Sequence, residues 1–74
     1  MTTDEVKQRI EAQIPGAVAV VSDLTGTGDH FKAEIRAEAF RGQSLIQQHK
    51  LVYSALGDLM KGPIHALQLD TRAP

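Results

Sequence analysis

The chain has 74 residues, of which 42% are hydrophobic and 23% charged, with a formal net charge of −1 and no cysteine. A chain this short forms one domain, residues 1–74, and its composition is that of a folded protein rather than a disordered one. The near-neutral charge argues against a general binder of nucleic-acid phosphates, which needs a surplus of Lys and Arg. The missing cysteines exclude disulfides and a thiolate nucleophile from this chain.

The N-terminal segment, MTTDEVKQRI, predicts a helix and not a targeting peptide. Thr2 and Glu5 have the spacing of a capping box, and Pro15-Gly16 ends the helix. The segment carries acidic residues where a targeting peptide carries basic ones, and no apolar run approaches the roughly 20 residues of a membrane span. We therefore expect a cytoplasmic protein that does not associate with membranes.

Two strands are predicted next. Residues 17–23 (AVAVVSD) are almost entirely apolar and rich in valine, and residues 30–37 (HFKAEIRA) alternate between apolar and polar positions. We expect an antiparallel hairpin whose long connection contains Gly26 and Gly28, both free to adopt positive φ angles.

The stretch 40–60 (FRGQSLIQQHKLVYSALGDLM) is the only one long and periodic enough for a confident long helix. Ser44 is its expected N-cap, Gly57 weakens its last turn, and Gly62-Pro63 ends it. At about 100° per residue, the core-facing arc comprises Leu45, His49, Val52, Leu56 and Leu59, flanked by Tyr53 and Met60.

Residues 64–70 (IHALQLD) predict a third strand, followed by a short frayed tail. The order is then αββαβ. Because a helix joins the second strand to the third, these two strands should be parallel. The charged outer face of residues 30–37 leaves only the opposite face for the helices. The sequence thus predicts an α+β fold, a three-stranded mixed sheet with both helices packed on one face.

Catalytic templates are absent from the sequence. It has no GxxxxGK[ST] phosphate loop, no HExxH and no nucleophile elbow. The GTGD fragment lacks the next spaced glycine of a dinucleotide motif and joins two strands, so it indicates a hairpin loop. We expect no enzymatic activity.

Three histidines remain as candidates for chemistry. His30 begins the second strand and His65 the third, so two parallel neighbouring strands would bring them to one edge of the sheet. Two imidazoles do not complete a tetrahedral metal site, and further ligands would have to come from a partner or a small thiol. The alternative for His65 is an ordinary surface histidine. His49 we interpret as a structural, buried, neutral histidine whose ring nitrogens are hydrogen-bonded.

The basic residues are dispersed along the chain, which favours a solvated surface and leaves a weak nucleic-acid groove as the alternative. They include Arg36, Arg41, Lys50, Lys61 and Arg72.

Three stretches together resemble the BolA family along nearly the whole chain: GDHFKAEI, FRGQSLIQQHKLVYSAL and IHALQL. They correspond to the family's HF-led strand, its F-x-G helix start and its late I-H-A-L strand. The glycine loop ahead of HF is most similar to the acid-response, YrbA-like branch of bacterial BolA proteins.

The resemblance implies a class II KH-like fold and a partner, a monothiol glutaredoxin with a CGFS motif. In such heterodimers a [2Fe-2S] cluster is shared between the glutaredoxin cysteine, a glutathione thiolate and ligands from the BolA protein. His65 matches the family's C-terminal histidine ligand. Alone, the protein would bind no cluster and would be a monomer or a weak homodimer.

The second ligand in the family is a cysteine or histidine within the hairpin loop, and residues 24–29 contain neither. His30, at the end of the loop, is therefore the candidate, with Asp29 or a missing ligand as the alternatives. The surface that would contact the glutaredoxin comprises Gly26, Gly28, Asp29, Gly62 and Pro63.

The family is also linked to transcriptional regulation and stress responses, so a KH-like DNA-binding regulator is the alternative function. The chain lacks the GxxG loop with which KH domains clamp phosphates. If DNA is bound, the resemblance points to Arg41, Gln47, Gln48 and Lys50 at the start of the long helix.

Overall fold

The computed structural model describes residues 1–74 and has the predicted αββαβ order, with two additional short 3₁₀ helices. The element bounds are α1 Thr3–Gln13, β1 Val18–Asp23, β2 His30–Arg36, η1 Glu38–Phe40, α2 Leu45–Leu56, η2 Gly57–Lys61 and β3 Ala66–Arg72.

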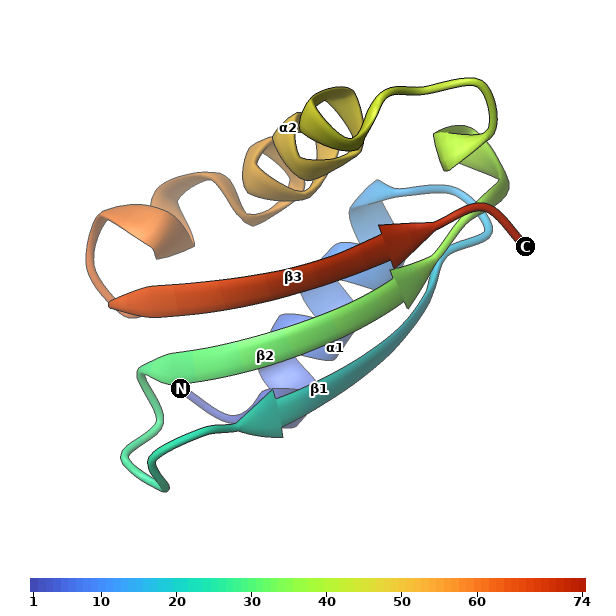
Figure 1. Ribbon diagram of the computed structural model, residues 1–74. Helices are drawn as coiled ribbons and strands as arrows, with labels where there is room; N and C mark the ends of the chain where they lie inside the picture. The colour runs from blue at the N-terminus through green and yellow to red at the C-terminus, as the bar shows by residue number, and fades with distance from the viewer.

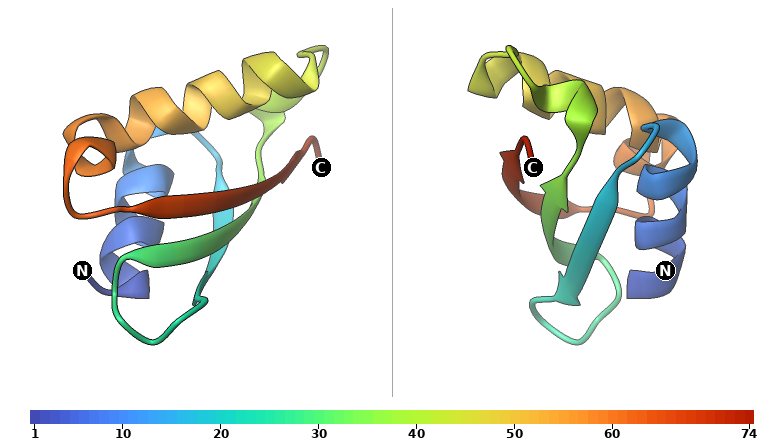
Figure 2. Two further views of the ribbon diagram at one scale, coloured as in Figure 1. Left: turned by 60° about the vertical axis from the view of Figure 1, so that its left-hand side comes forward. Right: turned by 90° about the vertical axis from the view of Figure 1, so that its right-hand side faces the viewer.

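The three strands form one mixed sheet in the order β1-β2-β3 (Figure 1). β1 pairs antiparallel with β2, from Val18 opposite Arg36 to Asp23 opposite Phe31. β2 pairs parallel with β3, and His30 lies opposite Ala66. Both helices cover the same face of the sheet, α1 packing mainly on β1 and α2 on β3 (Figure 2). The predicted fold class is confirmed.

The core lies between this sheet face and the two helices. β2 is the central strand and buries its alternate residues completely, as the apolar–polar alternation predicted. The 13 buried hydrophobic residues form a single cluster: Val6, Ile10, Ile14, Ala19, Phe31, Ala33, Ile35, Ala37, Phe40, Val52, Ala55, Leu56 and Ile64.

The start of α1 is the predicted capping box. The Glu5 N–H donates to the Thr2 hydroxyl, and the Glu5 carboxylate accepts from the Thr2 N–H, each at 3.1 Å. These bonds satisfy two of the backbone donors that a helix leaves free at its N-terminus.

The long helix is shorter than predicted. Ser44 caps it as expected, but α2 ends at Leu56, and the chain continues as the 3₁₀ helix η2 to Lys61. Gly57 causes the change, because its φ of +52° is incompatible with a continued α-helix. The prediction that Gly57 weakens the helix is confirmed, whereas the helical range predicted to reach residue 60 was too long.

Leu45 is 60% exposed, so its predicted place in the core-facing arc is wrong, and Tyr53, predicted to flank the arc, is 42% exposed. Gln48 of α2 already bonds to Thr71, near the last residue of β3. Leu45 is the first residue of α2 and lies about one turn before this contact.

The third strand spans 66–72 rather than 64–70. Ile64 is buried and precedes the strand, with its N–H bonded to the Leu59 carbonyl. Thr71 and Arg72, the first half of the tail predicted to fray, instead extend the ladder. Thr71 is 7% exposed, and its hydroxyl donates to Gln48 at 2.7 Å.

No helix is both long enough and apolar enough to cross a membrane.

Candidate functional site

His30 and His65 lie side by side at one end of the sheet. His30 is the first residue of β2, and His65 immediately precedes β3. The parallel register places Ala66 opposite His30, so His65 is one residue away from direct pairing. Their ring centroids are 5.0 Å apart, with the ring planes inclined by 52°. The juxtaposition expected from two parallel strands is confirmed, although His65 precedes β3 rather than beginning it.

Asp29 contacts both histidines. Its carboxylate accepts a hydrogen bond from Nδ1 of His30 at 2.7 Å. Its backbone carbonyl accepts from the N–H groups of His65 at 2.8 Å and Ala66 at 3.2 Å. Asp29 thus orients the His30 ring through its carboxylate and holds the backbone of His65 through its carbonyl.

The loop before the histidines is organised by Asp23, a residue that the sequence reading did not single out. One carboxylate oxygen accepts from the N–H of Gly26, and the other from the N–H of Gly28, each at 2.9 Å. Both glycines have the predicted positive φ, +74° and +76°. Aspartate side chains often accept hydrogen bonds from backbone N–H groups a few residues later in turns that contain glycine, so this role was within reach of the sequence.

The charge of Asp29 is favoured by its neighbours. Hydrogen bonds from the Thr27 hydroxyl and then from His30 lower the pKa of Asp29. The carboxylate is therefore ionised at neutral pH and available as an acceptor for the His30 ring.

The histidine pair is accessible to a partner. The side chain of His30 is one third exposed, and His65 is exposed. The glycine loop and the turn that contains Gly62 and Pro63 lie at this same end of the sheet (Figure 1). The segments expected to contact a partner thus lie at the same end of the sheet as the two histidines.

The spacing of the rings suits a shared metal centre. With metal–nitrogen bonds of about 2.0–2.1 Å, two imidazoles on one tetrahedral metal have their centroids roughly 5 Å apart, and the observed separation is 5.0 Å. The structure contains no group of three or more His, Cys, Asp or Glu residues able to hold a metal ion. Two imidazoles alone leave a tetrahedral metal two ligands short.

His49 differs from its prediction. Its Nε2 atom is buried and has no hydrogen-bond partner. Of the side chains one turn away on α2, Leu45, Ile46 and Val52 offer neither a donor nor an acceptor, and the Tyr53 hydroxyl does not bond to this nitrogen. The expectation that the ring nitrogens of His49 are hydrogen-bonded is therefore wrong for Nε2.

The four residues assigned to the alternative DNA surface are largely engaged within the protein. Arg41 makes a two-pronged ion pair with Glu38, at 2.6 and 3.1 Å. The Gln47 side chain caps α2, and Gln48 bonds to Thr71. Only Lys50 is exposed and unpaired. The start of α2 is exposed as predicted, and helix capping and tertiary contacts use most of the polar groups there, so DNA binding through these residues stays a prediction.

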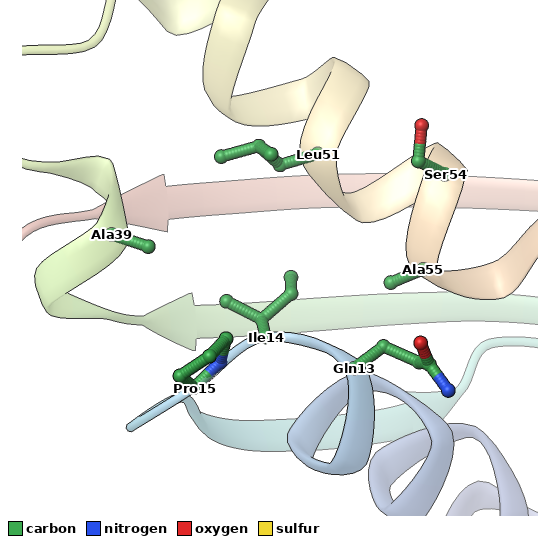
Figure 3. Close-up of a pocket in the computed structure, with 7 residues that line it drawn as sticks. All are labelled: Gln13, Ile14, Pro15, Ala39, Leu51, Ser54 and Ala55. Atoms are coloured by element: carbon green, nitrogen blue, oxygen red, sulfur yellow. The ribbon is translucent and has the colours of Figure 1, made fainter.

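A groove of about 200 Å³ lies between the end of α1, η1 and α2 (Figure 3). It contains no titratable group and no metal ligand, and it is separate from the histidine pair. Its lining residues are Gln13, Ile14, Pro15, Ala39, Leu51, Ser54 and Ala55.

Comparison with known proteins identifies the family. The BolA-like protein family matches residues 5–74. The protein RP812 of Rickettsia prowazekii is 34% identical over 71 residues, which cover 96% of this chain and 92% of that protein. The structure of a BolA homologue from Coxiella burnetii has a TM-score of 0.87 and 39% identity, covering all of this chain and 92% of that one.

A BolA domain also occurs within a larger plant protein. SufE-like protein 1 of Arabidopsis thaliana is 35% identical over 66 residues, which cover 88% of this chain and 18% of that protein. The structure of its BolA domain matches with a TM-score of 0.84 and 28% identity, covering 97% of this chain and 91% of the domain. The chain likewise spans 36% of the length of human BolA-like protein 1. The chain belongs to the BolA-like protein family.

Proposed function

We propose that this protein is a non-enzymatic adaptor that binds a monothiol glutaredoxin with a CGFS motif and shares a [2Fe-2S] cluster with it. His65 and His30 would supply two imidazole ligands, and the glutaredoxin cysteine and a glutathione thiolate the other two. The adaptor would act in iron–sulfur cluster trafficking or in iron or redox sensing.

The observation that carries this proposal is the histidine pair, with ring centroids 5.0 Å apart. Two neutral imidazoles form an incomplete ligand set that suits an iron with thiolates on the neighbouring metal. Family membership and the BolA domain of a SufE-like protein support a role related to iron–sulfur clusters.

The glutaredoxin would contact the exposed end of the sheet that carries the glycine loop, Gly62 and Pro63. Asp29 is better suited to orienting His30 than to ligation, since its Oδ1 atom already accepts two hydrogen bonds and only Oδ2 is left for a metal. This favours His30 over Asp29 as the second ligand.

The test is anaerobic reconstitution of the protein with a CGFS glutaredoxin, glutathione, iron and sulfide. We expect a one-to-one heterodimer whose visible absorption and circular dichroism differ from those of the glutaredoxin homodimer. His65→Ala should abolish the heterodimer spectrum, and His30→Ala should shift it or make the cluster labile.

His49→Leu is the matched control, because it removes a histidine outside the site and should leave the spectrum unchanged. Failure to form the heterodimer, or a spectrum unaltered by His65→Ala, would refute the proposed function.

A further inference from the structure

We propose that Asp29 is a positioning residue that holds His30 in the tautomer protonated on Nδ1 and leaves Nε2 as the free, ligand-binding nitrogen. The tautomer is a property of the metal-free protein. Its consequence for cluster ligation rests on the proposed function.

The hydrogen bond itself determines the tautomer. An ionised carboxylate only accepts hydrogen bonds, so the 2.7 Å contact between Asp29 and Nδ1 of His30 requires the proton on Nδ1. Neutral histidine side chains in water favour the opposite tautomer, with the proton on Nε2. Asp29 therefore reverses the intrinsic preference of the ring.

The position of the carboxylate is maintained by its own neighbours. The Thr27 hydroxyl donates to the same Oδ1 atom that His30 contacts. Asp23 holds the preceding loop through the N–H groups of Gly26 and Gly28. The Asp29 side chain is 42% exposed, so orienting His30 requires this fixed loop rather than burial.

This arrangement matches the outer sphere of metal-bound histidines. Such histidines usually donate their second ring N–H to a carboxylate or carbonyl, which fixes the ring orientation and raises the basicity of the ligating nitrogen. Here the carboxylate is that of Asp29.

The main chain of Asp29 has a separate role. Its carbonyl holds the backbone N–H groups of His65 and Ala66, and these bonds survive any side-chain substitution. Replacing the carboxylate should thus change the ring of His30 while leaving the backbone of His65 in place. This selectivity distinguishes positioning from a general structural role.

The first test is the tautomer of His30 in the metal-free, ¹⁵N-labelled protein, measured by long-range ¹H–¹⁵N correlation at mildly alkaline pH, where imidazole rings are neutral. We expect the Nδ1–H form in the unmodified protein and the Nε2–H form in Asp29→Ala. Asp29→Asn should retain the Nδ1–H form, because its amide oxygen still accepts. Asp70→Asn is the control for the lost charge, since Asp70 makes no hydrogen bond through its side chain.

The second test uses Zn²⁺ alone, without glutaredoxin. Loss of an outer-sphere partner typically weakens metal affinity by about 10–100-fold, so we expect Asp29→Ala to weaken Zn²⁺ binding by that factor. The Nδ1–H signal of His30 should persist in the zinc-bound protein. If Asp29 were itself the ligand, its contact with His30 would break on zinc binding and that signal would be lost.

An Nε2–H tautomer in the unmodified protein, or an unchanged tautomer in Asp29→Ala, would overturn the proposal. Equal Zn²⁺ affinity despite a changed tautomer would overturn its consequence for ligation. If the tautomer and zinc results hold but no cluster-bearing heterodimer forms, the proposed function fails while the role of Asp29 stands.

Discussion

At the scale of single residues, the three histidines illustrate how differently one residue type is used. His30 and His65 are accessible and adjacent, whereas His49 is half-buried on α2 with its Nε2 unpaired. A buried polar atom without a partner costs about 1–3 kcal/mol relative to one that is hydrogen-bonded. The sequence correctly separated His49 from the other two, but it could not predict the missing partner.

His49→Leu should raise the free energy of unfolding by about 1 kcal/mol, because it removes the unpaired nitrogen and introduces a better helix former. Urea denaturation followed by circular dichroism measures this change. His49→Ala is the comparison, since it also removes the ring but leaves an unfilled volume and should be less stable than His49→Leu. A stability loss in His49→Leu would indicate that the ring nitrogen has a partner in solution.

At the scale of elements, α1 and β1 are joined by a side chain. The Glu11 carboxylate accepts the Lys7 ammonium at 2.7 Å and the Ala19 N–H at 3.0 Å. Ala19 lies on the edge strand β1, so Glu11 satisfies a backbone donor that would otherwise be free for pairing with another chain. This contact also makes the docking of α1 on the sheet sensitive to pH.

The hydrogen bond from Lys7 is the main cause that lowers the pKa of Glu11, and the bond from the Ala19 N–H lowers it further. A carboxyl group whose pKa is lower in the folded state contributes stability above its unfolded pKa, about 4.3 for Glu. That contribution is lost as the pH falls through the folded-state pKa.

Glu11→Gln should therefore lose less stability than the unmodified protein between about pH 6 and about pH 3. Urea midpoints across this range measure the difference. Glu34→Gln, on the open face of the sheet, is the matched control and should keep the acid sensitivity of the unmodified protein. Parallel curves for Glu11→Gln and the unmodified protein would show that the Glu11 contact does not contribute.

At the scale of the whole molecule, the distribution of charge does not favour binding to nucleic acid. The net charge is −1, the Arg41 guanidinium is paired with Glu38, and the amides of Gln47 and Gln48 hydrogen-bond within the protein. Duplex DNA binding depends on several Lys or Arg residues contacting phosphates together. Lys50 alone does not provide this.

We expect duplex DNA to bind no more tightly than a dissociation constant of about 100 μM at physiological salt, the weak end of non-specific binding. Fluorescence anisotropy with a labelled duplex measures it, and Lys50→Ala should change it little. Tight binding with a steep salt dependence that Lys50→Ala reduces would contradict this expectation and restore the DNA-binding alternative.

The sequence by itself determined the order of elements, both helix N-caps and the antiparallel and parallel pairings. These features depend on short-range patterns: capping residues three apart, two-residue alternation in β2, and a helical connection that forces β2 and β3 to be parallel. That same parallel pairing predicted the meeting of His30 and His65.

Only the tertiary structure decided where α2 ends its contact with the sheet, where β3 begins, and what each polar side chain bonds to. Leu45 is 60% exposed although its helical position predicted a core contact, and β3 continues through Thr71, whose hydroxyl bonds to Gln48. The Asp29 contacts have two requirements. Asp23 must hold the loop conformation, and His65 and Ala66, more than 30 residues later in the sequence, must lie beside it. Such contacts join distant segments, so no local pattern specifies them, and they set the geometry of the histidine pair.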